Sequence, residues 1–278
     1  MARANLYSKS YFYLKTIIYI SYNMHKTIKK LLTLSAFSLT ASLISPLSFA
    51  DDDVIVDQSR NRTIPINITY PNESNQCSVH AKCPVAFINA GYGISHNDYT
   101  FASKLFNAQG YLSIAVAHEL KTDPALNRIQ PYLTTRMENW HRGVVTLKFL
   151  VYQLSAQYPE YNFSQLTLFG HSNGGDISAL YASIYPNEVS QLITLDHRRM
   201  LIPRNKNIRV LTLRGSDYPA DANVLLNETE LKSFPVSQVL IEKSRHNDMY
   251  DGGPKWLVDR MSKEMTVFIS SNQLNFLD

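Results

Sequence analysis

Residues 166–183, LTLFGHSNGGDISALYAS, decide the fold and the candidate site of this sequence. The apolar LTLFG predicts a strand, and the apolar spacing of residues 175–185 predicts a helix directly after it. Between them, Ser172 has Gly170 two residues before it and Gly174 two residues after it. A tight strand-to-helix turn of this kind strains the serine backbone, and glycines avoid clashes there and leave the hydroxyl exposed. The helix N-terminus also points its amides toward this hydroxyl, so we predict that Ser172 is a nucleophile.

A serine hydroxyl is a poor nucleophile without a general base beside it. The base is expected after the last strand, where IEKSRHNDMYDGG at residues 241–253 supplies His246. The chain order serine, acid, histidine also fits a turn of this kind. We therefore predict that His246 is the general base, and that His171, inside the turn, shapes the turn itself.

Two aspartates compete for the role of the acid that orients the base. Asp196 ends the segment LITLD, 24 residues after Ser172. Asp217 lies in LRGSDYPAD, 45 residues after Ser172 and 29 before His246. The usual place for the acid is the loop after the later strand, which favours Asp217, and Asp221 is a poorer third choice. The acid would fix the imidazole tautomer and stabilise the imidazolium, while the other aspartate is expected to be structural.

An oxyanion hole needs backbone donors aimed at the developing negative charge. One donor is expected to be the amide of Asn173, the residue after the nucleophile. The other is expected in the loop INAGYGISHNDY, residues 88–99, where we predict the amide of Tyr92. Gly91 and Gly93 in this loop would let the backbone approach an acyl oxygen.

Apolar runs that predict strands alternate along the chain with segments of helical spacing. Strands are expected at residues 54–70 (two strands), 84–90, 111–118, 166–170, 191–196, 208–215 and 236–242. Helices are expected at residues 99–110, 138–158, 175–185, 228–233 and 255–270. This alternation predicts an α/β fold, a mostly parallel sheet with helices on both faces. The link HRRMLIPRNKN, residues 197–207, leaves little room there for a lid domain.

The segments GHSNGG, NAGYG, QGYLSIAVAHE, ITLD and RHND together make residues 52–270 resemble an α/β-hydrolase. Within that fold the chain is similar to bacterial enzymes of the platelet-activating-factor acetylhydrolase and dienelactone hydrolase type. The resemblance implies ester hydrolysis without a metal or an organic cofactor. It implies an acid spaced like Asp196 in the acetylhydrolase branch and like Asp217 in the dienelactone branch. The turn GSD is one residue shorter than the common G-x-x-D turn, so we select Asp196 and keep Asp217 as the alternative.

These residues lead us to expect a serine hydrolase that cleaves short-acyl carboxylic esters through an acyl-enzyme on Ser172. Its partner would be a small-molecule ester. A peptidase or amidase that uses the same three residues is an alternative, because this chemistry serves esters and amides alike. A binding protein that keeps the fold without the chemistry is a second alternative.

The first 50 residues have the composition of a targeting segment. From Met24, the expected start, they contain a basic region (MHKTIKK), an apolar region with small residues, and SFA as a cleavage site. We predict cleavage after Ala50 and export to the periplasm or the medium. Residues 51–278 would then form a single domain without stable membrane insertion. The rival interpretation is a membrane anchor, but Ser, Thr and Pro46 interrupt the apolar run.

The two cysteines, Cys77 and Cys83, lie in QCSVHAKCP, directly before a predicted strand. An exported chain meets an oxidising compartment, where a closely spaced pair usually forms a disulfide. A metal site is the rival interpretation, but no second pair of ligands accompanies the two cysteines. We therefore predict a disulfide that closes the loop before the strand.

The basic excess of the chain belongs to its N-terminal segment. Residues 1–50 hold six of the 27 Lys and Arg and none of the 23 Asp and Glu. The remainder therefore shows no basic footprint for nucleic acid. Arg136, Trp140 and Arg142 open the helix predicted at residues 138–158, and we interpret them as residues of a surface helix.

Overall fold

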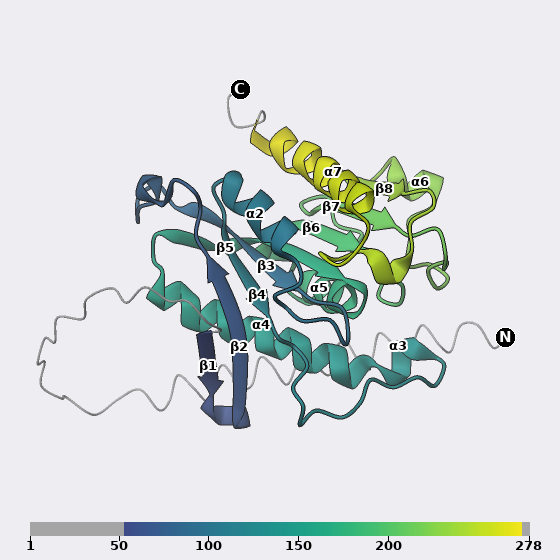
Figure 1. Cartoon of the computed structure of the whole chain (residues 1–278), viewed down its shortest axis with the longest axis horizontal. Coiled ribbons are helices and arrows are strands. Elements are labelled where there is room, and N and C mark those ends of the chain that lie inside the picture. Colours follow the sequence, from purple (N-terminus) through teal and green to yellow (C-terminus); the bar gives the residue numbers. More distant parts are fainter. Residues whose placement is uncertain (1–52, 274–278) are drawn as a thin grey trace, which may run out of the picture. The chain divides into compact units, whose positions relative to one another are not determined.

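The computed structural model of the chain describes residues 53–273. The predicted leader at residues 1–50, with its start at Met24 and its cleavage site at Ala50, lies outside the described residues. Within them, eight strands form one sheet in the order β1-β2-β4-β3-β5-β6-β7-β8 (Figure 1). The strands are β1 (Asp53–Asp57), β2 (Arg62–Thr69), β3 (Cys83–Asn89), β4 (Leu112–Val116), β5 (Tyr161–His171), β6 (Val189–Leu195), β7 (Arg209–Arg214) and β8 (Val236–Leu240).

Helices fill most of the connections between these strands. They are α2 (Thr100–Ala108), α3 (Tyr132–Thr135), α4 (Met137–Gln157), α5 (Ser172–Ile184), α6 (Glu228–Leu231) and α7 (Lys255–Gln273). Short 3₁₀ turns cover Gln58–Arg60, Ser74–Gln76, Pro186–Glu188 and His246–Asp248. The first of these turns joins β1 to β2, where the sequence predicted two strands around a turn.

The sheet is parallel from β4 to β8 in its spatial order. Strands β1 and β2 pair antiparallel, and so do β2 and β4, whereas every pair from β4 onward is parallel. The predicted fold class, a mostly parallel sheet with helices on both faces, is confirmed. The link between β6 and β7 contains no helix, and no large lid covers the described domain.

Two apolar cores lie on opposite faces of the sheet, because each central strand buries alternate residues on each face. In β5, Leu168 belongs to the core that α4 and α5 cover, while the next residue, Phe169, belongs to the core that α2 and α7 cover. The two helix pairs lie on the two sides of the sheet in Figure 1. The strands are therefore fully enclosed, and the fold holds their ends in fixed register.

That register brings several loops to one edge of the sheet. His171 at the end of β5 pairs with Leu195 at the end of β6, which pairs in turn with Leu213 in β7. Because parallel strands end at the same edge, the loops that follow them come together there. The predicted nucleophile, both candidate acids and the predicted base all lie on loops of this edge.

The predicted disulfide between Cys77 and Cys83 is present, with the two Cα atoms 5.2 Å apart. Cys83 is the first residue of β3, so the bond closes the loop before that strand. Within residues 53–273, no helix is long and apolar enough to cross a lipid bilayer.

Candidate active site

The turn between β5 and α5 has the strained geometry that its sequence predicted. Ser172 is the first residue of α5 and has a positive φ of 50°, which a non-glycine residue seldom adopts. A Cβ on Gly174 would lie 2.1 Å from the carbonyl oxygen of Asn89. A Cβ on Gly170 would lie 2.4 Å from the carbonyl oxygen of Gly174. Both glycines are therefore required by close approach of backbone to backbone.

The structure brings Ser172, His246 and Asp196 into one chain of contacts. The Nε2 of His246 lies 2.9 Å from the Oγ of Ser172, and its Nδ1 lies 2.6 Å from the Oδ2 of Asp196. Asp196 is fully buried and His246 nearly so. The ring can therefore hold a proton toward the carboxylate while its other nitrogen accepts one from the serine.

Asp196 owes its position to the end of β6. It follows the last residue of that strand, has a φ of 45°, and its amide donates to the carbonyl of Leu213. Its Oδ1 accepts from the amide of Gly215 at 3.0 Å and pairs with the Arg214 guanidinium at 2.9 Å. Burial raises the pKa of Asp196, but the His246 hydrogen bond and the Arg214 charge outweigh it and hold that pKa below its usual range. The carboxylate is therefore ionised opposite the ring.

Asp217, the alternative acid, contacts a different part of the same histidine. Its Oδ1 accepts a hydrogen bond from the main-chain amide of His246 at 2.9 Å. Its side chain is exposed, and it makes none of the hydrogen bonds to the His246 ring. The third candidate, Asp221, forms an ion pair with Arg199. Of the three aspartates, the structure places Asp196 against the ring.

The two predicted oxyanion amides lie on the loop after β3 and in the first turn of α5. The amide of Asn173 is in that first turn, where a helix has no internal acceptor for it. The amide of Tyr92 forms no hydrogen bond within residues 53–273, whereas that of the preceding Gly91 donates to the hydroxyl of Tyr99 at 3.0 Å. The Tyr92 hydroxyl accepts from the amide of Leu126, which ties this loop to the one after β4.

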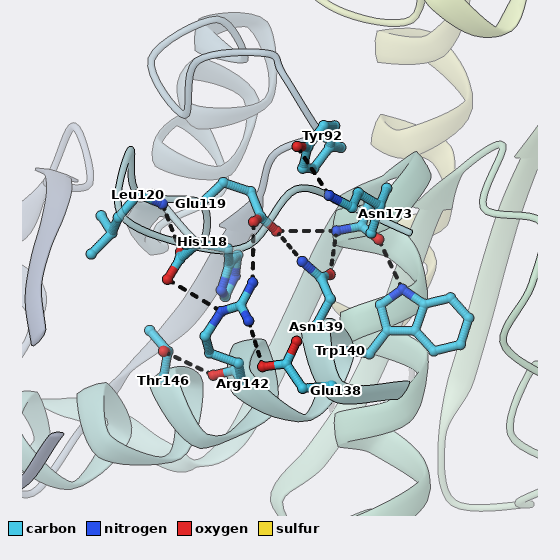
Figure 2. Close-up of polar contacts among 12 residues, drawn as sticks. Tyr92, His118, Glu119, Leu120, Glu138, Asn139, Trp140, Arg142, Thr146 and Asn173 are labelled. Atoms are coloured by element: carbon cyan, nitrogen blue, oxygen red, sulfur yellow. Dashed lines mark hydrogen bonds and ion pairs between the residues drawn. The ribbon is translucent and has the colours of Figure 1, made fainter. Parts of the chain in front are cut away.

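A polar network fixes the side chain of Asn173, as Figure 2 shows. Its Oδ1 accepts from the indole of Trp140 at 2.8 Å, and its Nδ2 donates to Asn139 at 2.9 Å and to Glu119 at 3.3 Å. The surface interpretation of Trp140 is therefore wrong, because the residue is fully buried. The apolar stripe that continues through Val144 in α4 was the available signal, since it places Trp140 on the buried face of this helix.

Charged residues surround the outer side of this network. The Arg142 guanidinium lies 3.5 Å from Glu119 and 3.5 Å from Asp123. Asp123 also pairs with Arg62 at 2.6 Å. Burial raises the pKa of Glu119, although the Asn139 hydrogen bond and the Arg142 charge oppose it. The loop after β4 is thus held beside Asn173 and Ser172 by paired charges.

Solved structures of several hydrolases are similar to this chain. Esterase 2 of Thermogutta terrifontis, phosphonylated by cyclosarin, matches with a TM-score of 0.60 at 11% identity, over 83% of this chain and 97% of the esterase. A serine hydrolase homologue from Coxiella burnetii matches with a TM-score of 0.54 at 15% identity, over 80% and 98% of the two chains. The dienelactone hydrolase of Anabaena variabilis matches with a TM-score of 0.53 at 13% identity, over 80% and 97%.

The chain has the α/β-hydrolase fold. No family model and no curated protein sequence matches it. The strand order and the position of Ser172 between β5 and α5 agree with that assignment.

Another histidine lies in the turn itself. His171 is buried, its Nδ1 lies 2.7 Å from the Tyr99 hydroxyl, and its Nε2 lies 3.0 Å from the carbonyl oxygen of His246. Burial lowers the pKa of His171 to about 3, so its ring is neutral. The sequence indicated that His171 shapes the turn, but nothing in it pointed to Tyr99 or to the base loop.

Across the part of the chain that the structure describes, no group of three or more His, Cys, Asp or Glu side chains could hold a metal ion. The aspartates of this edge bind the His246 ring, main-chain amides or arginines, and the His171 ring binds the Tyr99 hydroxyl and the His246 carbonyl.

Proposed function

We propose that this protein hydrolyses carboxylic esters through an acyl-enzyme on Ser172. The observation that carries the proposal is the continuous contact from Asp196 through both ring nitrogens of His246 to the Ser172 hydroxyl. The positive φ of Ser172 supports it, because that strain presents the hydroxyl at the top of the turn. Esterases and a dienelactone hydrolase among the structures with this fold support the same class of reaction.

In the proposed mechanism, Ser172 attacks the ester carbonyl while His246 takes its proton. Asp196 holds the imidazole in the required tautomer and stabilises the imidazolium that forms. The amides of Asn173 and Tyr92 donate to the oxyanion of the tetrahedral intermediate. His246 then protonates the leaving alcohol, and it later activates the water that cleaves the acyl-enzyme.

We propose short acyl groups because no large lid formed by residues 53–273 covers the sheet edge where Ser172 lies. An enzyme that works on oil droplets commonly shields its acyl pocket with such a segment, whereas soluble short esters need no such cover. The link from β6 to β7, residues 196–208, passes this edge without forming a helix.

The proposal is tested with p-nitrophenyl acetate, butyrate and octanoate, using the chain and its Ser172→Ala variant. We expect turnover of acetate and butyrate, with lower kcat/KM for octanoate. The variant should lose at least about a thousandfold in kcat, because the nucleophile and its base act as a unit. Absence of turnover above the variant for all three esters would contradict ester hydrolysis and favour an amidase or a binding protein.

Export is a further part of the proposal. The basic, apolar and small-residue regions before Asp51 support it, and the disulfide between Cys77 and Cys83 is typical of oxidising compartments. The mass of the protein recovered from periplasm or medium tests it, because cleavage after Ala50 leaves Asp51 as the first residue.

A further inference from the structure

All four polar groups of the His246 residue are engaged. Its two ring nitrogens contact Ser172 and Asp196, its main-chain amide donates to Asp217, and its carbonyl accepts from His171. We infer that Asp217 and His171 are positioning residues that clamp the main chain of the base from both sides. This inference rests on the proposed function of the same site, and it assigns a role to the aspartate that does not face the ring.

The Asp217 side of the clamp joins two loops. Beside the 2.9 Å bond to the His246 amide, the Ser216 amide and hydroxyl both donate to the carbonyl of Ser244, at 3.0 and 2.8 Å. The loop after β7 therefore holds the base loop on either side of Arg245. Gly215 separates the two acids, since a Cβ there would lie 3.1 Å from Asp217 and 3.2 Å from Asp196.

The His171 side of the clamp has a fixed direction. A carbonyl oxygen only accepts, so the Nε2 of His171 carries the proton that binds the His246 carbonyl at 3.0 Å. The neutral ring then accepts at Nδ1 from the Tyr99 hydroxyl, whose oxygen accepts from the Gly91 amide. Donors and acceptors match at each step.

These hydrogen bonds, from Gly91 through Tyr99 and His171 to His246, connect three loops whose relative positions matter for the proposed reaction. Gly91 precedes Tyr92, a predicted oxyanion donor, and His171 precedes Ser172. The carbonyl of His246 belongs to the base loop, and the rings of His171 and His246 lie 5.1 Å apart. A shift of the base loop would thus alter the distance from His246 to Ser172, and misplacement of about 1 Å can cost about a hundredfold in rate.

In the clamp, Asp217 has to supply a hydrogen-bond acceptor and not a charge. Its Oδ1 needs only to accept from an amide, which an asparagine oxygen also does. Asp196 must instead stabilise a positive imidazolium, which requires its charge. An asparagine at position 217 should therefore keep the function of Asp217, whereas an asparagine at position 196 should not keep the function of Asp196.

The test compares Asp217→Ala with Asp217→Asn in the full chain, with p-nitrophenyl butyrate as substrate. We expect Asp217→Ala to lower kcat about tenfold with KM changed less than about twofold, because the base is misplaced while the pocket is intact. Asp217→Asn should keep kcat within about threefold of the unmodified chain. Asp221 is an exposed aspartate of the same loop, so Asp221→Ala is the matched control and should leave kcat unchanged.

Hydrogen exchange of peptides that cover residues 241–250 gives a second readout that does not need turnover. Exchange at this segment should quicken in Asp217→Ala and stay slow in Asp217→Asn. The clamp would be overturned if Asp217→Ala had the same kcat and the same exchange as the unmodified chain. It would also be overturned if Asp217→Asn lost as much kcat as Asp217→Ala. Absence of any ester turnover, with the expected exchange pattern, would contradict the proposed function and leave the clamp supported.

Discussion

Asp196 and Asp217 lie on either side of Gly215 and bind different parts of one histidine. The Asp196 carboxylate contacts the ring and forms an ion pair with Arg214, whereas Asp217 accepts a hydrogen bond from the main-chain amide. Both aspartates follow a parallel strand, so either spacing in the sequence was compatible with the acid. The choice depends on where the ring of His246 lies, and this is decided by contacts far apart in the chain.

At the residue scale we predict that Asp196→Asn lowers kcat by roughly 10³- to 10⁴-fold, because the imidazolium loses its charge partner. Asp196→Ala should also lower the free energy of unfolding by about 3–5 kcal/mol, because the buried Arg214 guanidinium would be left unpaired. Ester kinetics and urea unfolding measure the two effects. An Asp196→Asn variant with kcat near that of the unmodified chain would contradict the assignment of the acid.

Ser172 lies at a strand-to-helix junction that packs against a neighbouring strand. Gly174 lies against the main chain at the end of β3, within reach of the carbonyl oxygens of Asn89 and Ala90. The same helix N-terminus is held on its other side, where Asp176 accepts from the amides of Arg199 and Met200. The turn is thus enclosed by the loops after β3 and β6.

At this scale we predict that Gly174→Ala lowers the free energy of unfolding by about 3 kcal/mol or more, or prevents folding. Its Cβ would lie 2.1 Å from the carbonyl oxygen of Asn89. The backbone at Asn89 cannot move aside as a flexible side chain could. Ser172→Ala is the control in the same turn and should keep the midpoint of thermal unfolding within a few degrees. A Gly174→Ala variant as stable as this control would contradict the close approach.

Across the described domain, burial keeps the rings of His118, His171 and His197 neutral. Burial lowers the pKa of each to about 3, from an ordinary value of 6.5. Each ring is hydrogen-bonded inside the protein, as in the 2.7 Å contact of His118 with Asn89. The unfolded chain protonates these rings below about pH 6.5, while the folded chain does so only near pH 3. Their contribution to stability is therefore complete above pH 6.5 and is lost as the pH falls toward 3.

Asp176 has the opposite effect over part of this range. Burial raises its pKa to about 6, although the amides of Met200 and Arg199 bind its carboxylate. The folded chain therefore binds a proton at Asp176 below about pH 6, whereas the unfolded chain binds it only below about pH 4. This uptake offsets one of the three histidine protons near pH 5.

At the scale of the whole molecule we predict that the three histidines and Asp176, with two protons net, lower the free energy of unfolding by roughly 3 kcal/mol per pH unit near pH 5. Urea unfolding between pH 7 and pH 4.5 measures this slope. His197→Gln should reduce the slope by about 1.4 kcal/mol per pH unit, since one buried ring is removed. His141→Gln, at an exposed position, should leave it unchanged. Equal slopes in the two variants would contradict the neutral state of His197.

The sequence by itself determined the alternation of strands and helices, the parallel sheet, the turn around Ser172 and the Cys77–Cys83 disulfide. The elements and the turn depend on side-chain periodicity and local sterics within short windows of the chain. The disulfide was predicted from two closely spaced cysteines that follow a targeting segment. The glycines two residues before and after Ser172 are the clearest case, because their spacing alone indicates close backbone approach.

Only the tertiary structure decided which aspartate meets the ring of His246, how Trp140 binds Asn173, and how Tyr99 and His171 connect the loops. The pairing of Leu195 with Leu213 puts Asp196 beside Arg214 and Gly215, and this register is a property of two strands together. Trp140 and Asn173 are 33 residues apart and meet because α4 packs beside α5 on one face of the sheet. Such contacts depend on how elements pack, and a window of sequence contains only one of the two partners.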